Sequence, residues 1–295
     1  MYNVFETLRS PSIGEILPRV RTFEIGEILF ASFTCPGTGE WQPGWAQHDF
    51  ILHVVTGSKT LRAAAGIWDL GPGDTIFVKK GAVFMRQNTP GEVCLFMFFI
   101  PDEFVCSTVR EMASEFPVLP PPAEPRDMAI RVQHDAGVAA FLQAMRVFFA
   151  ASDTPPELLL KLKLKEVIAS LVVSPANAVL SSYLRSLLSR DAPSVATIME
   201  ANCFHNLPLE AFAKLCSRSL STFKRDFRQH YGVAPGRWLL ERRLEQAAHL
   251  LSTTSMSVTE IVFECGFEQA AHFSRSFKSR FGQTPSDYRQ TSVAA

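Results

Sequence analysis

The sequence lacks any long uninterrupted apolar run. Its longest ones, Val93–Ile100 and Val167–Val173, have the length of a strand or of half a helix, whereas a membrane-spanning helix needs about 20 residues. The N-terminus also lacks the basic start and the following apolar stretch of a secretory signal. From these absences we expect a cytoplasmic protein without a membrane partner.

Catalytic and cofactor motifs are missing as well. The chain contains no G-x-S-x-G, no phosphate-binding loop and no dinucleotide fingerprint. Its six cysteines include no C-x-x-C pair, and their spacings match neither a zinc site nor a dense disulfide framework. We therefore expect no enzymatic activity, no catalytic residue, no bound metal and no cofactor.

Net charge is also absent, because 29 Lys and Arg residues balance 29 Asp and Glu residues. Proteins that bind nucleic acid usually carry a basic excess. The balance is an average, however, since residues 196–295 hold 12 basic and 9 acidic side chains and the remainder of the chain is acidic. Zero net charge thus does not exclude nucleic acid, but it disfavours a tight monomeric complex and favours binding by two paired chains.

What the sequence does contain is enough apolar material for two domains, with 295 residues of which 47% are hydrophobic. In the first 100 residues, short apolar runs alternate with turn clusters such as Gly71–Asp74. The runs Phe50–Val55, Thr75–Val78 and Val93–Ile100 predict strands of a β-sandwich or barrel. The proline-rich segment Phe116–Pro125 predicts an extended connector that leaves this β unit.

Beyond this segment the apolar period becomes helical. Apolar residues recur at helical intervals in Val138–Phe149, Glu157–Val173 and Ala178–Leu188. Three lysines within the middle stretch predict a solvated helix edge. Such helices either pack on the β unit or form a seam between two chains, and the sequence leaves both arrangements open.

The last hundred residues contain a repeat with an offset of fifty. The residues that match in type at this offset are Glu210 and Glu260, Phe223 and Phe273, Arg225 and Arg275, Phe227 and Phe277, Arg228 and Lys278, Tyr231 and Phe281, Gly232 and Gly282, Pro235 and Pro285, and Trp238 and Tyr288. Each copy consists of a short apolar helix, a turn and a second helix that carries aromatic residues. This is the helix-turn-helix pattern in duplicate.

The spacing within each copy has a physical meaning. Phe223, Phe227 and Tyr231 share one face of a helix, so the basic residues between them point outward. The glycine that follows occupies the position of a helix C-cap. Between the copies, Gly236–Leu251 predicts a helix about 24 Å long. A rigid spacer of this size can hold two recognition helices about one DNA turn apart, roughly 34 Å.

These residues resemble the DNA-binding domain of the AraC/XylS family of bacterial transcription regulators. The resemblance covers Leu207–Tyr288 and is carried most clearly by Ser257–Phe267, His272–Lys278 and Phe281–Arg289. It implies a sequence-specific transcriptional activator whose partners are double-stranded promoter DNA and RNA polymerase. It also implies that the chain works as a homodimer.

The resemblance further implies which residues contact DNA. Base edges are read from the exposed faces of the second helices by Ser221, Lys224, Arg225, Ala270, Ala271 and Arg275. Phosphates are contacted by Arg228, His272 and Lys278. Alanine at two reading positions departs from the polar residues often found there, so we expect the second unit to read fewer bases directly.

The N-terminal β unit resembles the cupin-like β-barrel that regulators of this family commonly carry. Leu70–Gly81 is similar to the L-x-P-G-D strand and turn of that barrel. A closer resemblance, to the subgroup that activates type III secretion genes, rests on the same segment and on Leu162–Ile168 followed by Ser174 and Pro175. It implies control by self-association or by an inhibitory protein partner.

A small-molecule effector inside the barrel is the alternative. The residues that would line its pocket are Trp41, Trp45, Phe50 and Trp68. Filling of the barrel core explains the same aromatic side chains equally well. A metal site is not expected, because His48 and His53 are five residues apart and would face opposite sides of a strand.

The sequence as a whole predicts an α+β protein. We expect a cupin-like β-barrel regulatory domain at residues 1–115 and a connector with amphipathic dimerisation helices at residues 116–190. We expect a DNA-binding domain with two helix-turn-helix motifs at residues 195–295.

Overall fold

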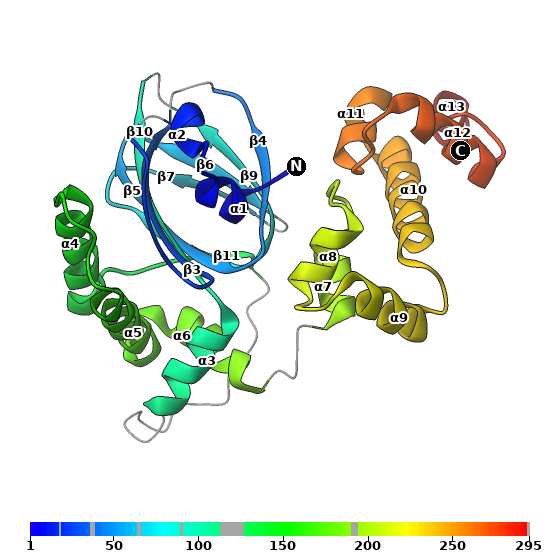
Figure 1. Ribbon diagram of the computed structural model, residues 1–295. Helices are drawn as coiled ribbons and strands as arrows, with labels where there is room; N and C mark the ends of the chain where they lie inside the picture. Colours follow the sequence, from blue (N-terminus) through cyan, green and yellow to red (C-terminus); the bar gives the residue numbers. More distant parts are fainter. Residues whose placement is uncertain are drawn as a thin grey trace. The chain divides into compact units, whose positions relative to one another are not determined.

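The computed structural model describes residues 1–17, 19–35, 39–63, 66–88, 91–112, 127–189 and 194–293. The connector predicted at Phe116–Pro125 lies outside the described residues. The chain divides into two compact units, residues 2–191 and residues 192–295 (Figure 1). The first unit combines strands and helices and the second is helical, so the predicted α+β class is confirmed.

Two sheets form the cupin-like β-barrel of the first unit. In spatial order, the smaller sheet consists of β1 (Tyr2–Asn3), β4 (Gln42–Ala46), β9 (Gly81–Gln87), β6 (Lys59–Ala63) and β7 (Gly66–Leu70). In the same order, the larger sheet consists of β11 (Ala129–Arg131), β8 (Thr75–Val78), β5 (Asp49–Thr56), β10 (Val93–Ile100), β3 (Ile28–Cys35) and β2 (Arg21–Ile25). The strands predicted at Thr75–Val78 and Val93–Ile100 have the predicted bounds.

Strand β10 is apolar along its whole length because both of its faces are buried. Leu95, Met97 and Phe99 point into the barrel, whereas Phe96 and Phe98 point to the helices on the outside. The strand lies between β3 and β5 and pairs with both in antiparallel register. An alternating pattern would leave one face of a strand polar, and the continuous run VCLFMFFI instead marks a central strand covered on both sides.

The N-terminal helix α1 (Val4–Arg9) fills one end of the barrel. Its side chains Val4, Phe5 and Leu8 are buried in the barrel cluster, and the Phe5 ring lies 5.4 Å from the Phe99 ring. Asn3 caps this helix, since its side chain accepts hydrogen bonds from the first turn. The short helix α2 (Ile13–Ile16) follows, and the interior of the barrel is therefore packed with side chains from the first residues of the chain.

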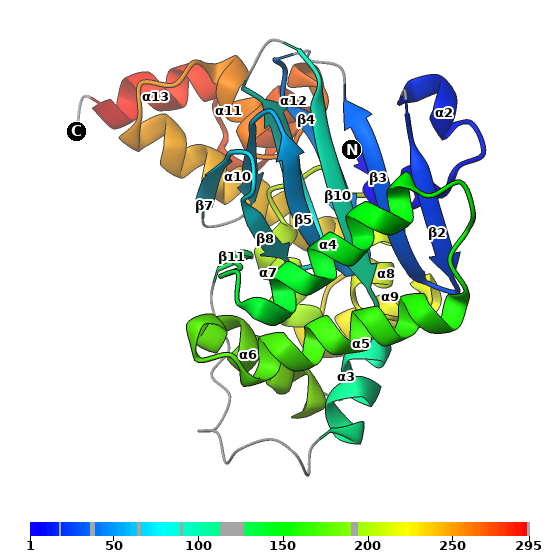
Figure 2. The same cartoon turned by 90° about the vertical axis from the view of Figure 1, so that its left-hand side faces the viewer.

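Four helices share one hydrophobic core with the outer face of the larger sheet. They are α3 (Asp102–Glu111), α4 (Ala136–Ala150), α5 (Glu157–Val173) and α6 (Ala178–Ser186), with single 3-10 turns at Pro175–Asn177 and Leu187–Ser189. Figure 2 shows α4 and α5 lying across the strands. Their inner side chains, among them Phe141, Met145 and Leu164, share one core with Phe96 and Phe98. The first of the two arrangements left open by the sequence, packing on the β unit, is therefore observed.

The first unit has no single helix, within its described residues, that is long and apolar enough to cross a membrane. The pair Glu157–Val173 and Pro175–Ser186 reaches the required length and composition together, but it bends by 82° at the break. The same pair contributes Leu164, Val167 and Leu184 to the core beneath the sheet.

A buried carboxylate joins the barrel to α6. Asp49 at the start of β5 is fully buried, and it accepts hydrogen bonds from the Lys80 backbone amide at 2.8 Å and from the Tyr183 hydroxyl at 2.7 Å. Burial, together with the nearby Asp102 carboxylate, raises the pKa of Asp49 to about 6. Lys80 in turn forms an ion pair of 2.6 Å with Asp102 on α3. The role of Asp49 as a buried link is not visible from its neighbours in sequence.

The second unit consists of seven helices within its described residues. They are α7 (Val195–Asn202), α8 (Leu209–Leu215), α9 (Leu220–Tyr231), α10 (Pro235–Thr253), α11 (Val258–Glu264), α12 (Ala270–Phe281) and α13 (Pro285–Val293). The spacer helix α10 is longer than predicted because Pro235 occupies its first turn, where proline is favoured, and Ser252 and Thr253 extend its C-terminal end. Its last turns contribute Leu244, Ala247 and Leu251 to the core of the second repeat copy.

Candidate nucleic-acid interface

The offset-fifty repeat is reproduced in three dimensions by matching ring contacts. In the first copy the Phe227 ring lies 4.6 Å from the Tyr231 ring, and it meets the Trp238 ring edge to face at 5.8 Å. In the second copy the Phe277 ring lies 4.6 Å from the Phe281 ring, and it meets the Tyr288 ring edge to face at 5.4 Å. Each recognition helix is thus held on its inner side by the same aromatic arrangement.

The ends of the recognition helices also match. Both α9 and α12 end at a glycine in the left-handed conformation, Gly232 with φ 73° and Gly282 with φ 79°. A side chain at φ near +75° is strained, so these two positions require glycine. The N-termini differ, because Ser219 caps α9 with a side-chain hydrogen bond whereas Gln269 makes none to α12.

The outward face of α9 presents the four residues predicted to contact DNA. Ser221, Lys224, Arg225 and Arg228 are all exposed, at spacings that place them on one side of the helix. The Arg225 side chain is 75% exposed, and its Nε lies 3.3 Å from a carboxylate oxygen of Asp226. The face is therefore basic and accessible, while Phe223 and Phe227 on the opposite side are fully buried.

A second arginine orients this carboxylate. Arg218, in the turn before α9, donates to Asp226 at 3.0 Å and to the Cys216 carbonyl at 3.2 Å. Asp226 thus stands between a fixed arginine and the exposed Arg225, and it restrains the direction of the Arg225 guanidinium. Neither Arg218 nor Asp226 was predicted as a functional residue, because the first has no counterpart at the offset of fifty and the second aligns with a serine.

The outward face of α12 presents the five residues predicted for the second copy. Ala270, Ala271, His272, Arg275 and Lys278 are all exposed. Two of these side chains are methyl groups, so the face offers fewer hydrogen-bond donors than that of α9. The opposite side of α12 is closed by Phe273 and Phe277, which are fully buried.

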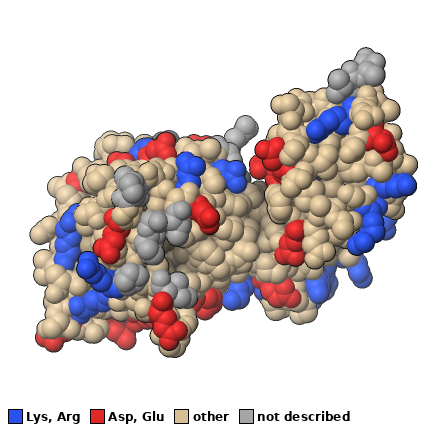
Figure 3. Space-filling model, turned by 90° about the horizontal axis from the view of Figure 1, so that it is seen from above, with Lys and Arg blue, Asp and Glu red and all other residues tan. Residues whose placement is uncertain are grey.

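A concave surface lies beside each of the two recognition helices within this unit. One hollow of about 750 Å³ is lined by residues of α9 and α10, including Lys224, Arg225 and Arg228. A second hollow of about 580 Å³ reaches from the start of α8 to Gln269 and His272 at the start of α12. Both include Leu209 and Gly236 in their linings. Figure 3 shows Lys and Arg side chains gathered along one edge of the second unit.

The aromatic residues considered for a ligand pocket lie in different surroundings. Phe50 and Trp68 contribute to the barrel cluster, whereas Trp45 is buried in β4. Trp41 stacks against the guanidinium groups of Arg62 and Arg86 at 5.3 and 4.7 Å. The structure therefore brings two of the four together in the barrel interior, where α1 also packs.

The two N-terminal histidines face different sides of the larger sheet. His48 lies against the Phe5 ring at the end of the barrel, and the buried His53 lies 2.9 Å from the Thr75 hydroxyl near α4. Burial, with Arg146 next in effect, lowers the pKa of His53 to about 4. Among the described residues, no group of three or more His, Cys, Asp or Glu side chains is placed to hold a metal ion.

Comparisons with known protein families agree with this geometry. Residues 212–291 match a helix-turn-helix domain family, and residues 49–183 match the ExsA N-terminal regulatory domain. The first match covers both recognition helices, and the second covers most of the barrel and its covering helices.

Similar proteins have been described in several bacteria. The chain is 28% identical to the virulence regulon transcriptional activator VirF of Yersinia enterocolitica over 83% of its own length and 90% of that protein. It is 27% identical to the helix-turn-helix transcriptional regulator ExsA of Pseudomonas aeruginosa over 81% and 85% of the two chains. The solved DNA-binding domain of AdpA, in complex with a target DNA, is 32% identical over 34% of this chain and 90% of that domain, with a TM-score of 0.33.

The duplicated helix-turn-helix unit, its matching aromatic supports and the two domain matches agree with one another. The chain is a DNA-binding transcriptional regulator, and its N-terminal unit is of the regulatory type. The chain therefore belongs to the AraC family of helix-turn-helix transcriptional regulators and carries an ExsA-type N-terminal regulatory domain.

Proposed function

We propose that the protein is a dimeric activator that reads two successive major grooves of promoter DNA with α9 and α12. The observation that carries this proposal is the pair of exposed faces on helices whose opposite faces are buried in matching aromatic clusters. Base edges are read by Ser221, Lys224, Arg225, Ala270, Ala271 and Arg275. Phosphates are bound by Arg228, His272 and Lys278.

The length of α10 supports two contacts on one side of the duplex. Its 19 residues span about 28 Å, and the turns at its ends add to the separation of the recognition helices. One turn of B-form DNA is about 34 Å. A helix of this length therefore suits two adjacent major-groove segments.

A footprint on selected DNA tests this function. Duplexes that bind the full-length protein are first selected from a random-sequence pool. We expect hydroxyl-radical footprinting and base-methylation interference to reveal, within each site bound by one chain, two contacted major-groove segments about one helical turn apart. Selection that yields no preferred sequence, or a single contacted segment per chain, would contradict the proposal.

A second copy of the chain is the proposed partner of the α4–α5 surface. The outer side of α5 carries exposed leucines between its charged side chains, with Leu158 67% exposed and Leu162 51% exposed. Val147 on the adjacent α4 is also exposed. An apolar surface of this kind on a helix pair is typical of an interface. Pairing of two chains through it would bring two recognition-helix pairs to one promoter.

Charge placed on this surface is expected to separate the dimer. The double variant Leu158→Glu and Leu162→Glu should sediment as a monomer at concentrations at which the wild type is a dimer, because two unpaired carboxylates would be buried at the seam. Analytical ultracentrifugation measures the change. The matched control is Ile67→Glu, since Ile67 on β7 is 63% exposed and lies on the other sheet. A dimer that survives the double variant would place the interface elsewhere.

The remaining parts of the proposal concern regulation. We assign residues 1–115 to signal reception, residues 116–190 to dimerisation and residues 195–295 to DNA binding, in a cytoplasmic protein that activates RNA polymerase. The packed barrel interior, which includes Phe5 and Phe50, supports control by self-association or by an inhibitory protein rather than by a small molecule. The similarity to the virulence regulon activator VirF supports a role in the type III secretion subgroup.

A further inference from the structure

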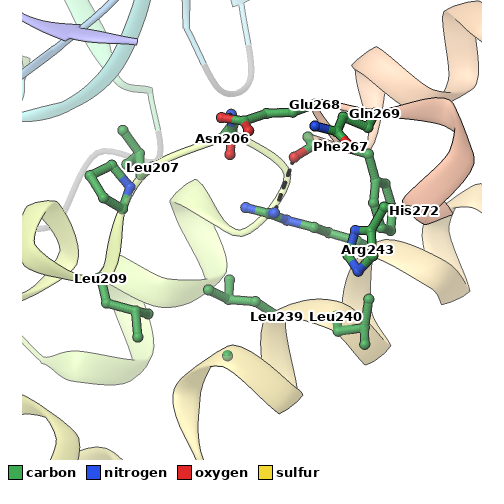
Figure 4. A pocket seen from close by; sticks show the side chains of 13 residues that line it. Asn206, Leu207, Leu209, Leu239, Leu240, Arg243, Phe267, Glu268, Gln269 and His272 are labelled. Atoms are coloured by element: carbon green, nitrogen blue, oxygen red, sulfur yellow. Dashed lines mark hydrogen bonds between the residues drawn. The ribbon is translucent and has the colours of Figure 1, made fainter. Parts of the chain in front are cut away.

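One arginine on the spacer helix is bonded to both helix-turn-helix units. Arg243 lies in the middle of α10, and its guanidinium donates three hydrogen bonds to backbone carbonyls. Its Nε donates to Cys203 at 2.8 Å and its Nη2 to His205 at 2.7 Å, both in the segment between α7 and α8. Its Nη1 donates to Gly266 at 3.0 Å, in the turn between α11 and α12 (Figure 4).

The turn that receives this bond is packed directly on the segment Cys203–Asn206, which precedes α8 and the first helix-turn-helix copy. Gly266 has φ 76°, and a Cβ added to it would lie 2.6 Å from the Phe204 carbonyl oxygen. That carbonyl belongs to the backbone, which cannot move aside as a flexible side chain does. Glycine at this position therefore permits both the left-handed turn and the close approach of these two segments.

A side-chain hydrogen bond joins the same two segments at the rim of the hollow of about 580 Å³ described above. Asn206 donates to the Glu268 carboxylate at 2.6 Å, and Figure 4 shows both residues above the Arg243 guanidinium. The segment Cys203–Asn206 is thus joined to the turn Gly266–Glu268 by one direct hydrogen bond, by the bridging guanidinium of Arg243 and by the close packing of Gly266 on Phe204. Arg243 is the member of this set that is anchored on the helix between them.

We propose that Arg243 is a positioning residue that fixes the separation and rotation of α9 relative to α12. The proposal rests on the proposed function, in which both helices enter the same duplex. A planar guanidinium with donors in a fixed fork holds three carbonyls in one arrangement, and an ammonium on a flexible stem does not. Arg243 thereby restricts the protein to DNA sites with one spacing between the two contacted segments.

The physical basis is that two linked binding modules gain affinity when they are held in the geometry of the bound state. Insertion of one base pair between the segments shifts and rotates the second relative to the first. A rigid pair of helix-turn-helix copies then loses contacts, whereas a pair joined loosely adapts to the new spacing at the cost of affinity for the native one. The dependence of affinity on the spacing between the two segments, the spacing profile, therefore reports on Arg243 separately from the contacts that α9 and α12 make.

The experiment measures binding of the full-length protein to a series of selected duplexes in which the spacing is changed by one or two base pairs. For the wild type we expect affinity to fall by about tenfold or more per inserted base pair. For Arg243→Lys we expect about tenfold weaker binding at the native spacing and a profile that is flat to within about threefold. The matched control is Arg242→Lys, because Arg242 is the adjacent, exposed arginine of α10 and pairs with Glu245.

A second variant keeps the test decisive if Arg243→Lys fails to fold. The double variant Asn206→Ala and Glu268→Ala removes the hydrogen bond at the rim. It should also reduce the fall in affinity per inserted base pair, by about threefold. If the variants that fold keep the wild-type dependence of affinity on spacing, the proposal for Arg243 is overturned while the proposed function stands. Failure of the wild type to select any sequence would overturn the proposed function and, with it, this inference.

Discussion

Replacement of Arg225 by alanine should weaken binding to a selected site by about 1–3 kcal/mol and relax the preference at one base pair. The Arg225 side chain is 75% exposed on α9, and its Nε is 3.3 Å from Asp226. An arginine oriented in this way can donate two parallel hydrogen bonds to a guanine edge. Loss of those bonds weakens binding to duplexes with the cognate base and leaves binding to duplexes with another base at that position unchanged. Titration of duplexes that differ at each position measures the change.

Arg228→Ala is the matched comparison for this variant. Arg228 lies one turn along the same exposed face, and we assign it to a phosphate. Its loss should weaken binding about equally on selected and random duplexes and should reduce the slope of log affinity against log salt by about 1. If Arg225→Ala behaves in this second way, the assignment of Arg225 to a base is wrong.

Phe227→Ala should lower the free energy of unfolding of the second unit by about 3–5 kcal/mol. The Phe227 side chain is fully buried, and its ring contacts Tyr231 at 4.6 Å and Trp238 at 5.8 Å. Truncation leaves a cavity beneath α9 and removes the support of its exposed face. We therefore expect specific DNA binding to be lost together with stability. Urea unfolding followed by circular dichroism gives the free energy.

Phe263→Ala provides the control for this prediction. Phe263 belongs to the same unit but is 64% exposed on α11, so its truncation leaves no cavity. The free energy of unfolding should change by less than about 0.5 kcal/mol. Equal destabilisation by the two variants would show that the Phe227 cluster is not the support of α9.

The helix-turn-helix repeat could be predicted in detail because its signals are local. The aromatic spacing in α9 and the glycine after it lie within one helix length, and the copy at offset fifty repeats each of them. Strands β8 and β10 were predicted for a similar reason, since turn residues bound short apolar runs. In each of these cases the information that determines the element lies within the element itself.

The contacts between distant segments could not be predicted. The insertion of Phe5 into the barrel depends on Phe99, which lies far along the chain. Arg243 had no distinguishing sequence signal, because its three acceptors are backbone carbonyls and a carbonyl is present in every residue. Asp49 looks like an ordinary polar residue until Tyr183 is brought to it. Chemistry that depends on such meetings is visible only in the folded chain.

The pairing of the barrel strands has a consequence for the time course of folding. Strand β3 pairs with β10, some sixty residues later, and α1 packs against strands that are made long after it. In the second unit each recognition helix instead packs on helices close to it in the chain. Contacts between distant residues slow folding and local ones speed it. At about 5–20 residues per second, the ribosome completes the barrel several seconds before the last helix emerges. The slower unit is thus made first, and it has these seconds to fold while the second unit is still being synthesised.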